Sequence, residues 1–470
     1  MNKINRKASK IISILILCYF CVIFIQTPVL SPPSQILVDV NQVVANVGRY
    51  SLGMNLNFLS DRSAITTALK DLNLGSLRYP MGEIADYYLF DRQNPTQPQI
   101  SVQDPDLWFS KLSNPDGTWK NPLNFDKFMG MCKTLDAEPF ITVGIDALAY
   151  TGNSPHKTPE EVLQAAIDWV EYANITKNYD IKYWEIGNEN DLPSDRVDWT
   201  PEAYANTVVK FARAMKKVDP TITVGVNGMT GSTWWDKVMP IVKNDVDFLV
   251  THQYSSMQSY GQWRANSWNY TSNIEAATLA IKTYNPKLRL NVTENSSFNP
   301  GASHANNIWK MLHNFEMLGN TLSFQKVDYL HFWISRWFEN NSYLNDFSAF
   351  YSDYKLTPIG RSLAIWNNFI RQQIVYTSKL DNIRSWASFD REEQLLSLFL
   401  LNKDRQSQQV KITFNNYDGN QNSEHWILTG PDPGSTKVIW QQLTPIKVKR
   451  HRTAAKLEPL SVTVLTFKIS

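Results

Sequence analysis

The sequence contains little cysteine and almost no excess charge. Three cysteines occur in 470 residues, and two of them, Cys18 and Cys21, lie in an apolar run near the start. Because only Cys132 remains beyond that run, a disulfide framework and a zinc site built on cysteine are both excluded there. Lys and Arg number 46 against 44 Asp and Glu, a formal net charge of +2. Without a basic field to hold a phosphate backbone, the chain is not expected to bind nucleic acid.

Apolar and aromatic residues, in contrast, are plentiful. Hydrophobic residues make up 43% of the chain and charged residues 19%, which is typical of a globular protein with a large core. The 16 tryptophans are a high number for this length. Large aromatic side chains mostly pack in cores, but exposed Trp and Tyr also suit the apolar faces of sugars. The composition is therefore compatible with a carbohydrate ligand.

The first 25 residues resemble an export signal. A stretch with four basic and no acidic residues, 1–10, precedes an apolar run from Ile11 to Ile25, the order found in secretory signals. That run is shorter than the ~20 residues that span a bilayer, yet no small-x-small cleavage site follows it. Residues 1–35 are thus predicted to be a cleaved signal peptide or a membrane anchor, with a linker. We expect a secreted, periplasmic or membrane-anchored protein with its folded part outside the cytoplasm.

The central part of the chain alternates short β-branched runs with amphipathic helical stretches. Eight such units predict a closed (β/α)8 barrel over residues 44–372. An open doubly wound sheet is the alternative, but the Gly-rich turn after its first strand is lacking. Thr158 and Thr200, each followed by Pro and Glu, are expected to cap helices. The expected strands are Tyr50–Phe58, Leu74–Pro80, Ala137–Asp146, Ile181–Glu189, Thr221–Gly228, Asp247–Tyr254, Leu288–Glu294 and Val327–Ile334.

After Gln373 the pattern changes to strands joined by polar turns. We expect an all-β module over residues 373–470, most simply a β-sandwich. An extra strand at residues 36–43 precedes the barrel and is expected to join this module. The predicted strands are Ile374–Leu380, Ile383–Phe389, Leu395–Leu401, Gln409–Phe414, His425–Thr429 and Leu460–Lys468.

Two of the barrel strands are predicted to end in glutamate. Glu189 closes the fourth strand and Glu294 closes the seventh. In such barrels the chemistry sits at the carboxyl ends of the strands. One glutamate there is ordinarily a loop residue bonded to backbone amides, but two together form the pair that glycosidic cleavage requires. One carboxyl group protonates the leaving oxygen, while the other attacks the anomeric carbon or activates water.

The segment around the first glutamate resembles a known family. Residues 184–189 read W-E-I-G-N-E, similar to the W-x-x-G-N-E motif on strand four of the clan A retaining glycoside hydrolases. The resemblance implies that Asn188 contacts the sugar 2-hydroxyl and that Glu189 is the acid/base. The V-T-E sequence that ends in Glu294 resembles the position of the nucleophile on strand seven.

Weaker matches follow in the order expected of that clan. Arg78, in L-R-Y-P-M-G, resembles the strand-two arginine of arabinofuranosidase-like members and would support the nucleophile. In H-Q-Y, His252 is expected to donate or accept hydrogen bonds in the pocket and Tyr254 to bond the nucleophile. Trp333 resembles the tryptophan at the sugar floor. The layout of residues 36–470 is shared by families 51, 39, 30 and 79. It implies a retaining O-glycoside hydrolase of plant, microbial or extracellular polysaccharides or oligosaccharides, without metal or cofactor.

The sequence departs from the family 51 pattern in its first strand. Asn57 stands where an arabinofuranosidase presents an acid to the substrate hydroxyls, and Met81 replaces a glycine. A carboxylate binds hydroxyls more strongly than an amide does. With Asn57 as a substrate-binding residue, we expect a pyranoside or an oligosaccharide to be preferred, stacked on tryptophans such as Trp235, Trp263 and Trp337.

Two further interpretations stay open at this point. Glu185 alternates onto the same strand face as Glu189 and is expected to lie in a deeper barrel layer, paired with a cation. The protein could also be a non-catalytic carbohydrate-binding relative on the same fold, because a fold does not guarantee chemistry. The oligomeric state cannot be predicted from these patterns.

Overall fold

Eight parallel strands close into a barrel in the computed structural model, which describes residues 34–229, 231–266, 270–297, 306–337, 347–380, 382–417 and 423–468. The predicted (β/α)8 fold is confirmed, and each strand lies within its predicted range except the one at Arg289–Ser296, which continues beyond Glu294. Around the barrel the order of strands is β10-β11-β2-β3-β6-β7-β8-β9. The strands are β2 (Leu52–Asn55), β3 (Ser76–Tyr79), β6 (Glu138–Val143), β7 (Tyr183–Ile186), β8 (Thr223–Asn227), β9 (Phe248–Tyr254), β10 (Arg289–Ser296) and β11 (Val327–Phe332).

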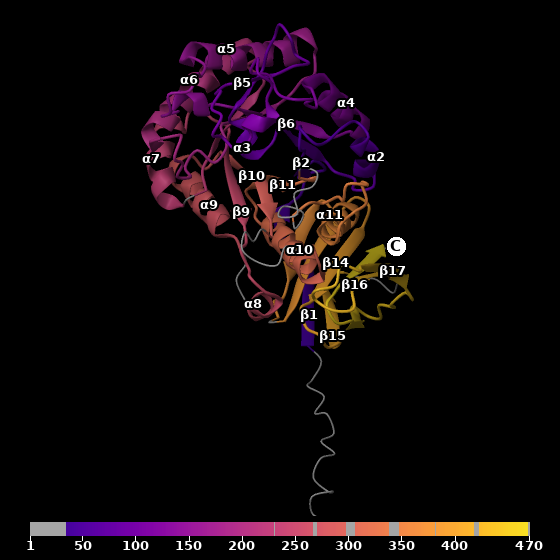
Figure 1. The fold of residues 1–470 in the computed structure, drawn as a ribbon. Coiled ribbons are helices and arrows are strands. Elements are labelled where there is room, and N and C mark those ends of the chain that lie inside the picture. Colours follow the sequence, from indigo (N-terminus) through magenta and orange to yellow (C-terminus); the bar gives the residue numbers. More distant parts are fainter. Residues whose placement is uncertain are drawn as a thin grey trace, which may run out of the picture.

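Helices surround this barrel (Figure 1). Thr158 caps α5 through a reciprocal bond with Glu161, and Thr200 caps α6, which satisfies backbone amides that a helix start leaves without partners. A short hairpin of β4 (Tyr88–Leu89) and β5 (Gln99–Ile100) lies between β3 and β6 in the chain. The helices are α2 (Ile65–Lys70), α3 (Gly82–Ala85), α4 (Phe125–Leu135), α5 (Pro159–Val170), α6 (Pro201–Val218), α7 (Ser232–Val242), α8 (Tyr260–Ala265), α9 (Ser272–Tyr284), α10 (Ile308–Leu322) and α11 (Pro358–Phe369).

A nine-stranded, mostly antiparallel sheet forms the second part of the molecule. Its order is β17-β16-β19-β14-β13-β12-β1-β15-β18, and it encloses its own apolar core. The N-terminal β1 joins it by pairing antiparallel to β12 and parallel to β15. The strands are β1 (Ser34–Asn46), β12 (Gln373–Thr377), β13 (Ile383–Asp390), β14 (Leu395–Asn402), β15 (Gln408–Asn415), β16 (Glu424–Thr429), β17 (Ile439–Leu443), β18 (Arg452–Leu457) and β19 (Ser461–Lys468).

The sequence patterns missed β17 and β18, and both are edge strands of this sheet. Edge strands are half solvated, so they lack the apolar alternation by which inner strands are found. The other predicted strands of the module are present, and the all-β module is confirmed. The exact domain bounds stay a prediction.

Side chains of the barrel, of α10 and α11 and of the sheet belong to one apolar core. Figure 1 shows α10 and α11 beside the strands of the sheet. Trp366 of α11 lies 4.3 Å from Phe399 of β14, measured between ring centroids. Glu316 of α10 is fully buried and pairs with Lys403 and Arg384, at 3.1 and 2.7 Å. Such a buried charge must be paired to be tolerated. The contacts fix the sheet against the outside of the barrel, away from the strand ends that carry chemistry.

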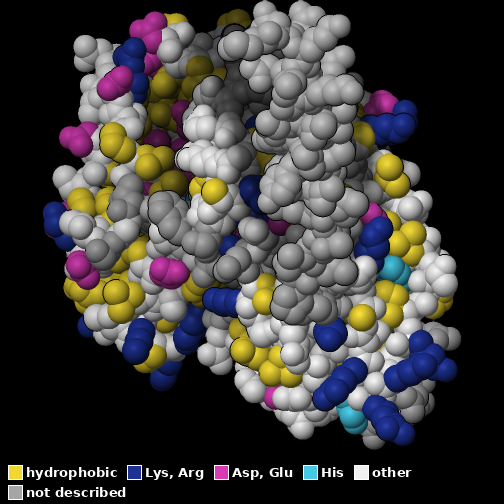
Figure 2. All heavy atoms as spheres, turned by 90° about the horizontal axis from the view of Figure 1, so that it is seen from below, with side chains coloured by type: hydrophobic (Ala, Val, Ile, Leu, Met, Phe, Trp, Pro, Cys, Tyr) yellow, Lys and Arg dark blue, Asp and Glu magenta, His cyan; other side chains and the backbone are white. Residues whose placement is uncertain are grey.

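The surface and the N-terminal segment add two observations. Figure 2, a view from below, shows Lys and Arg side chains gathered in the lower part of the picture. Lys447, Lys449, Arg450 and Arg452 are exposed, while Val448 between them is buried. Among the described residues, no helix combines the length and the apolar character needed to cross a membrane. The predicted signal or anchor lies outside the described residues.

Candidate active site

A cavity of about 410 Å³ opens at the carboxyl ends of the barrel strands. The two predicted catalytic carboxylates, Glu189 and Glu294, both lie in its wall, together with Tyr254 and Trp333. This is the end of the barrel at which loops and strand termini assemble active sites. The other lining residues are Met81, Gly82, Glu83, Ile84, Trp108, Leu192, Met229, Trp337 and Phe347.

Glu294 lies inside β10 at an irregularity of the strand. The register of β10 shifts between Val292 and Glu294 against β9, the signature of a β-bulge. A bulge re-aims side chains, and here Thr293 and Glu294 both contact groups inside the barrel. Asn55 donates from Nδ2 to the Thr293 carbonyl at 2.8 Å, which satisfies a backbone oxygen at the irregularity. The bulge therefore delivers a strand residue to the cavity with its backbone still paired.

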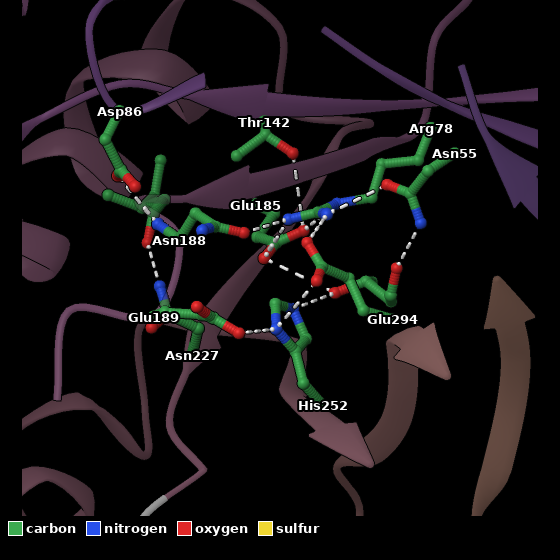
Figure 3. A network of polar contacts seen from close by, with 12 residues as sticks. Asn55, Arg78, Asp86, Thr142, Glu185, Asn188, Glu189, Asn227, His252 and Glu294 are labelled. Carbon is green, nitrogen blue, oxygen red and sulfur yellow. Dashed lines mark hydrogen bonds and ion pairs between the residues drawn. The ribbon is translucent and has the colours of Figure 1, made fainter. Parts of the chain in front are cut away.

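Arg78 of β3 is a buried cation in the polar network that Figure 3 shows. Its Nη1 donates to Glu294 at 2.8 Å and to the Asn55 side chain at 3.0 Å. Its Nε and Nη2 donate to the two oxygens of Glu185, each at 3.0 Å, and Nη2 also donates to Asn188 Oδ1 at 2.8 Å. All five N–H groups of the guanidinium are thus used. Arg78 fixes the orientation of Glu294 and compensates the fully buried Glu185 in a deeper layer.

Glu189 lies in a tight loop after β7 rather than on the strand itself. Gly187 and Glu189 have positive φ angles, +74° and +50°, so the alternation assumed from the sequence stops at Ile186. A Cβ atom on Gly187 would lie 1.9 Å from Asn190 Oδ1, so only glycine fits there. For a glutamate, the left-handed conformation is costly and persists only where the surroundings hold it.

Buried polar groups hold this loop in place. Asp86 accepts a bond from the Asn188 amide at 2.8 Å. Asn227 of β8 donates to the Ile186 carbonyl and to Asn190 Oδ1, both at 2.9 Å. Because these groups are buried and mutually satisfied, they position Glu189 from below without occupying its carboxylate.

His252 joins the two carboxylates from β9 (Figure 3). Its Nδ1 lies 2.7 Å from Glu189 Oε1 and 3.5 Å from Glu294 Oε2, and its Nε2 lies 3.1 Å from Thr293 Oγ1. Tyr254 donates a hydrogen bond to Glu294 Oε2. One oxygen from each glutamate and a nitrogen of His252 lie within 4.8 Å of one another. Carboxyl groups at this spacing are typical of retaining glycosidases and too close for inverting ones.

The surroundings of Glu189, Glu294 and His252 change their pKa values in different ways. Desolvation in the cavity wall raises the pKa of Glu189 to about 7, with a further contribution from the charge of Asp191. Burial also raises the pKa of Glu294, as does the charge of Glu189, while Arg78 and the Tyr254 hydroxyl favour its charged form. Burial lowers the pKa of His252 and keeps it neutral. Glu189 is therefore suited to hold a proton near neutral pH and Glu294 to be a carboxylate.

Glu189, His252 and Glu294 also form a set of ligand types that metal ions use. Arg78, however, lies 2.8 Å from Glu294 and already places a buried positive charge against this set. A second cation would be repelled by it. The arrangement fits a proton-transfer and nucleophile pair better than a metal centre.

The tryptophans separate into cavity and core residues. Trp333 and Trp337 line the cavity. Trp235 and Trp263 are 1% and 0% exposed, and the Trp263 indole donates to buried Glu316 at 2.8 Å. The sugar-stacking role expected of these two was therefore wrong, because both rings are buried in the core. Trp108, which the sequence analysis did not single out, is 40% exposed and lies 6.1 Å from Trp337 in a near-parallel stack.

Asn57 lies away from the cavity, contrary to its predicted role in substrate binding. It is fully buried, and its Nδ2 donates to the Arg336 carbonyl at 3.2 Å. Its Oδ1 accepts from the amides of Leu59 and Ser60. Asn57 thus closes the turn after β2 and ties it to the segment after β11. An acidic residue does line the cavity, but it is Glu83 of α3, five residues beyond Arg78.

Part of the sequence is similar to known proteins. Residues 68–273 match the model of the alpha-L-arabinofuranosidase 1 domain. A probable alpha-L-arabinofuranosidase C of Aspergillus niger is 30% identical over 205 residues, which are 38% of this chain and 35% of that protein. The chain therefore spans only about a third of the length of this relative.

Solved structures resemble the whole fold. The alpha-L-arabinofuranosidase of Thermotoga maritima, in complex with arabinose, superposes with a TM-score of 0.74 at 17% identity, covering 93% of this chain and 100% of that one. The family 51 enzyme AbfB of Bifidobacterium longum gives 0.73 at 17% identity with the same coverage. The predicted resemblance to clan A retaining glycoside hydrolases of the arabinofuranosidase type is confirmed.

The family model covers only one of the two glutamates in the cavity wall. The matched residues 68–273 include Arg78, Asn188 and Glu189 but end before Glu294. Glu294 is placed by the structure instead, through its contacts with Arg78 and Tyr254 and its distance from Glu189. The site thus combines residues from the segment that matches the family model with Glu294 of β10, which lies outside that segment and reaches the site through the fold.

Proposed function

We propose that the protein is a retaining glycoside hydrolase that cleaves α-L-arabinofuranosides by double displacement. The observation that carries this proposal is the approach of the Glu189 and Glu294 carboxyl oxygens to within 4.8 Å in one cavity wall. Two carboxyl groups at such a distance leave no room for a water molecule between nucleophile and sugar, so the enzyme attacks the sugar itself.

In the first step Glu294 attacks the anomeric carbon and the bond to the leaving oxygen breaks. Glu189 gives its proton to that oxygen, so the aglycone leaves as a neutral alcohol and a glycosyl ester forms on Glu294. Arg78 holds Glu294 at 2.8 Å and keeps one oxygen oriented, while Tyr254 binds the other. The positioned nucleophile and acid replace a diffusional encounter by an intramolecular reaction.

In the second step Glu189 acts as a base. Its carboxylate, now without a proton, removes one from a water molecule that attacks the anomeric carbon of the ester. The bond to Glu294 breaks, the sugar leaves with its original configuration, and Glu189 is protonated again. The His252 contact at 2.7 Å keeps the Glu189 side chain at the same place through both proton transfers.

The choice of an arabinofuranoside follows from the relatives and from the position of Asn57. The expected preference for a pyranoside rested on Asn57 facing the substrate, and Asn57 is buried in a turn instead. The matching domain model and the Aspergillus niger relative are both described as alpha-L-arabinofuranosidases. These descriptions favour an arabinofuranoside over the sugars considered from the sequence.

The test is a comparison of kcat/KM on matched nitrophenyl glycosides: α-L-arabinofuranoside, β-xyloside, β-glucoside and β-glucuronide. We expect the arabinofuranoside to be favoured by tenfold or more, about 1.4 kcal/mol of transition-state preference. A Glu294→Ala preparation purified in parallel controls for contaminating hydrolases. No hydrolysis of any glycoside above that control would overturn the proposal in favour of the non-catalytic alternative.

We also propose that the chain is exported. The support is the basic stretch and apolar run of residues 1–25. Cell fractionation with an antibody against the barrel tests this, and mass spectrometry of the recovered chain distinguishes a cleaved signal from a retained anchor. Recovery of the intact chain in the cytoplasm alone would contradict it.

A further inference from the structure

Glu83 is an acidic side chain in the cavity wall to which the proposed mechanism gives no role. It lies in α3, directly after Met81 and Gly82 at the end of β3. Gly82 allows this placement, because a Cβ atom there would lie 2.4 Å from the Trp333 ring. The close approach of α3 to Trp333 brings Glu83 to the same cavity as Glu189 and Glu294.

One oxygen of Glu83 is held in a fixed position. Trp108 donates from Nε1 to Glu83 Oε2 at 3.0 Å, and Trp108 is itself stacked near Trp337 across the cavity rim. Burial raises the pKa of Glu83, an effect that the Trp108 bond opposes and the nearby charge of Glu189 increases. The orientation of Glu83 is therefore set by an indole N–H, in the same cavity wall as Glu189.

We propose that Glu83 is the specificity-determining carboxylate of this site and accepts hydrogen bonds from hydroxyl groups of the sugar held between Glu189 and Glu294. The inference rests on the proposed glycosidase function. A sugar ring seated on Trp333 against Glu294 presents its hydroxyls to the remaining walls of the cavity, and Glu83 is the acidic acceptor in the wall supplied by α3. Its Oε1, opposite the oxygen that Trp108 occupies, is the atom that receives the hydroxyl.

The chemistry of this acceptor defines the preferred sugar. A carboxylate forms short, charge-assisted bonds to hydroxyls, roughly twice as strong as those of an amide. It also repels a negative group on the ligand, so a uronic acid is disfavoured relative to the neutral sugar of the same ring size. The acid that was expected near Asn57, on the first barrel strand, is thus supplied by Glu83 of α3, after the second barrel strand.

The experiment combines variants of this wall with deoxy substrates. Glu83→Ala, Glu83→Gln and Trp108→Phe are compared with Glu160→Ala, a control on the exposed start of α5. The substrates are nitrophenyl α-L-arabinofuranoside and its 3-deoxy and 5-deoxy analogues. We expect Glu83→Ala to lose about 10- to 100-fold in kcat/KM on the parent. Glu83→Gln loses less, and Trp108→Phe, which keeps a ring but not the N–H, loses least.

The deoxy analogues separate a direct contact from a structural effect. If Glu83 binds one hydroxyl, the analogue that lacks it loses a similar factor in wild type and loses little more in Glu83→Ala. The contact would be overturned if, for both analogues, the loss in kcat/KM from the missing hydroxyl and the loss from Glu83→Ala multiplied. It would also be overturned if kcat/KM of Glu83→Ala on the parent substrate were within twofold of that of Glu160→Ala. Activity in wild type with either result leaves the proposed function standing. If wild type neither hydrolyses these glycosides nor binds L-arabinose in calorimetry, both proposals are wrong.

Discussion

Glu189 and Glu294 face each other across one cavity, but the protein holds them by opposite means. Glu294 is part of a barrel strand, 4% exposed in its side chain, and its carboxylate is bound by Arg78 and Tyr254. Glu189 stands on a left-handed loop with a quarter of its side chain exposed, and its carboxylate contacts neutral His252. Hydrogen bonds hold the Glu294 carboxylate itself, whereas near Glu189 they hold the backbone of the loop that carries it.

The difference fits the two roles proposed for these two residues of one type. A carboxylate beside a buried guanidinium and a phenol hydroxyl is favoured in its charged form, as a nucleophile must be. A carboxyl group in a partly desolvated wall near another acid, Asp191, keeps its proton to a higher pH, as a general acid must. The carboxylate without a cation can change its protonation in every cycle. The predictions below test this division of roles.

The largest effect is expected from Glu294→Ala. Without the nucleophile no glycosyl ester forms, and the buried Arg78 loses one of its two compensating charges. We expect kcat/KM to fall by at least about 10⁴-fold on every substrate, whatever its leaving group. Stopped assays with nitrophenyl and dinitrophenyl glycosides measure this. If the variant kept more than about 1% of the wild-type kcat/KM on either glycoside, another residue would be the nucleophile.

Glu189→Ala should lose less, and by an amount that depends on the leaving group. A dinitrophenolate leaves without a proton, so we expect a loss of about 10²–10⁴-fold on natural linkages and far less on dinitrophenyl glycosides. Azide should restore turnover by attacking the glycosyl ester, which yields a glycosyl azide of retained configuration. In Glu294→Ala azide would replace the nucleophile and yield the inverted product. NMR of the azide products distinguishes the two carboxylates, and exchanged configurations would reverse their roles.

The pH dependence tests the same division at smaller amplitude. Glu189 must be protonated to act, and its pKa is raised to about 7, so kcat/KM should fall about tenfold per unit above that pH. Below it, activity should persist until Glu294 becomes protonated. His252 does not produce the alkaline limb, because burial lowers its pKa. Profiles of wild type and Glu189→Gln on a glycoside with an alcohol leaving group, which needs the proton to depart, provide the measurement. An alkaline limb that persists in the variant would point to another acid.

Much of this architecture was predictable from local sequence. The eight barrel strands lie in short segments rich in apolar residues, separated by amphipathic helical stretches, and this alternation is visible in the local sequence. The W-E-I-G-N-E segment identified Glu189 because its chemistry is concentrated in six consecutive residues. Both glutamates of the cavity wall could therefore be named from the sequence, although the loop conformation of Glu189 could not.

Features that depend on distant parts of the chain were not predictable. The bulge that turns Glu294 inward is a mismatch of register between β10 and its neighbours, which neither strand shows alone. Glu83 and Trp108 meet only because α3 and the loop after β5 converge on the cavity. Whether Trp263 lies in the core or at the mouth depends on its partner Glu316, which is 53 residues away in the chain.

The smallest expected effect on chemistry comes from Asn57→Asp, the change that would restore an acid to the first strand. If Asn57 touched substrate, this variant would gain activity on arabinofuranosides. In the structure the new carboxylate would instead lie in a buried turn beside Asp61, whose Oδ2 accepts a hydrogen bond from the backbone N–H of residue 57 at 2.9 Å. The hydrogen bond from the Asn57 side chain to the Arg336 carbonyl would be lost.

We therefore expect Asn57→Asp to lower the free energy of unfolding by about 1–3 kcal/mol, because a like charge is buried and an acceptor is left without its donor. The ratio of kcat/KM between arabinofuranoside and xyloside should stay within twofold of wild type. Urea unfolding and the paired kinetics measure both, with Glu83→Gln as the contrasting variant, in which the ratio shifts and stability changes little. A gain in the arabinofuranoside ratio without loss of stability would return Asn57 to the cavity and remove that role from Glu83.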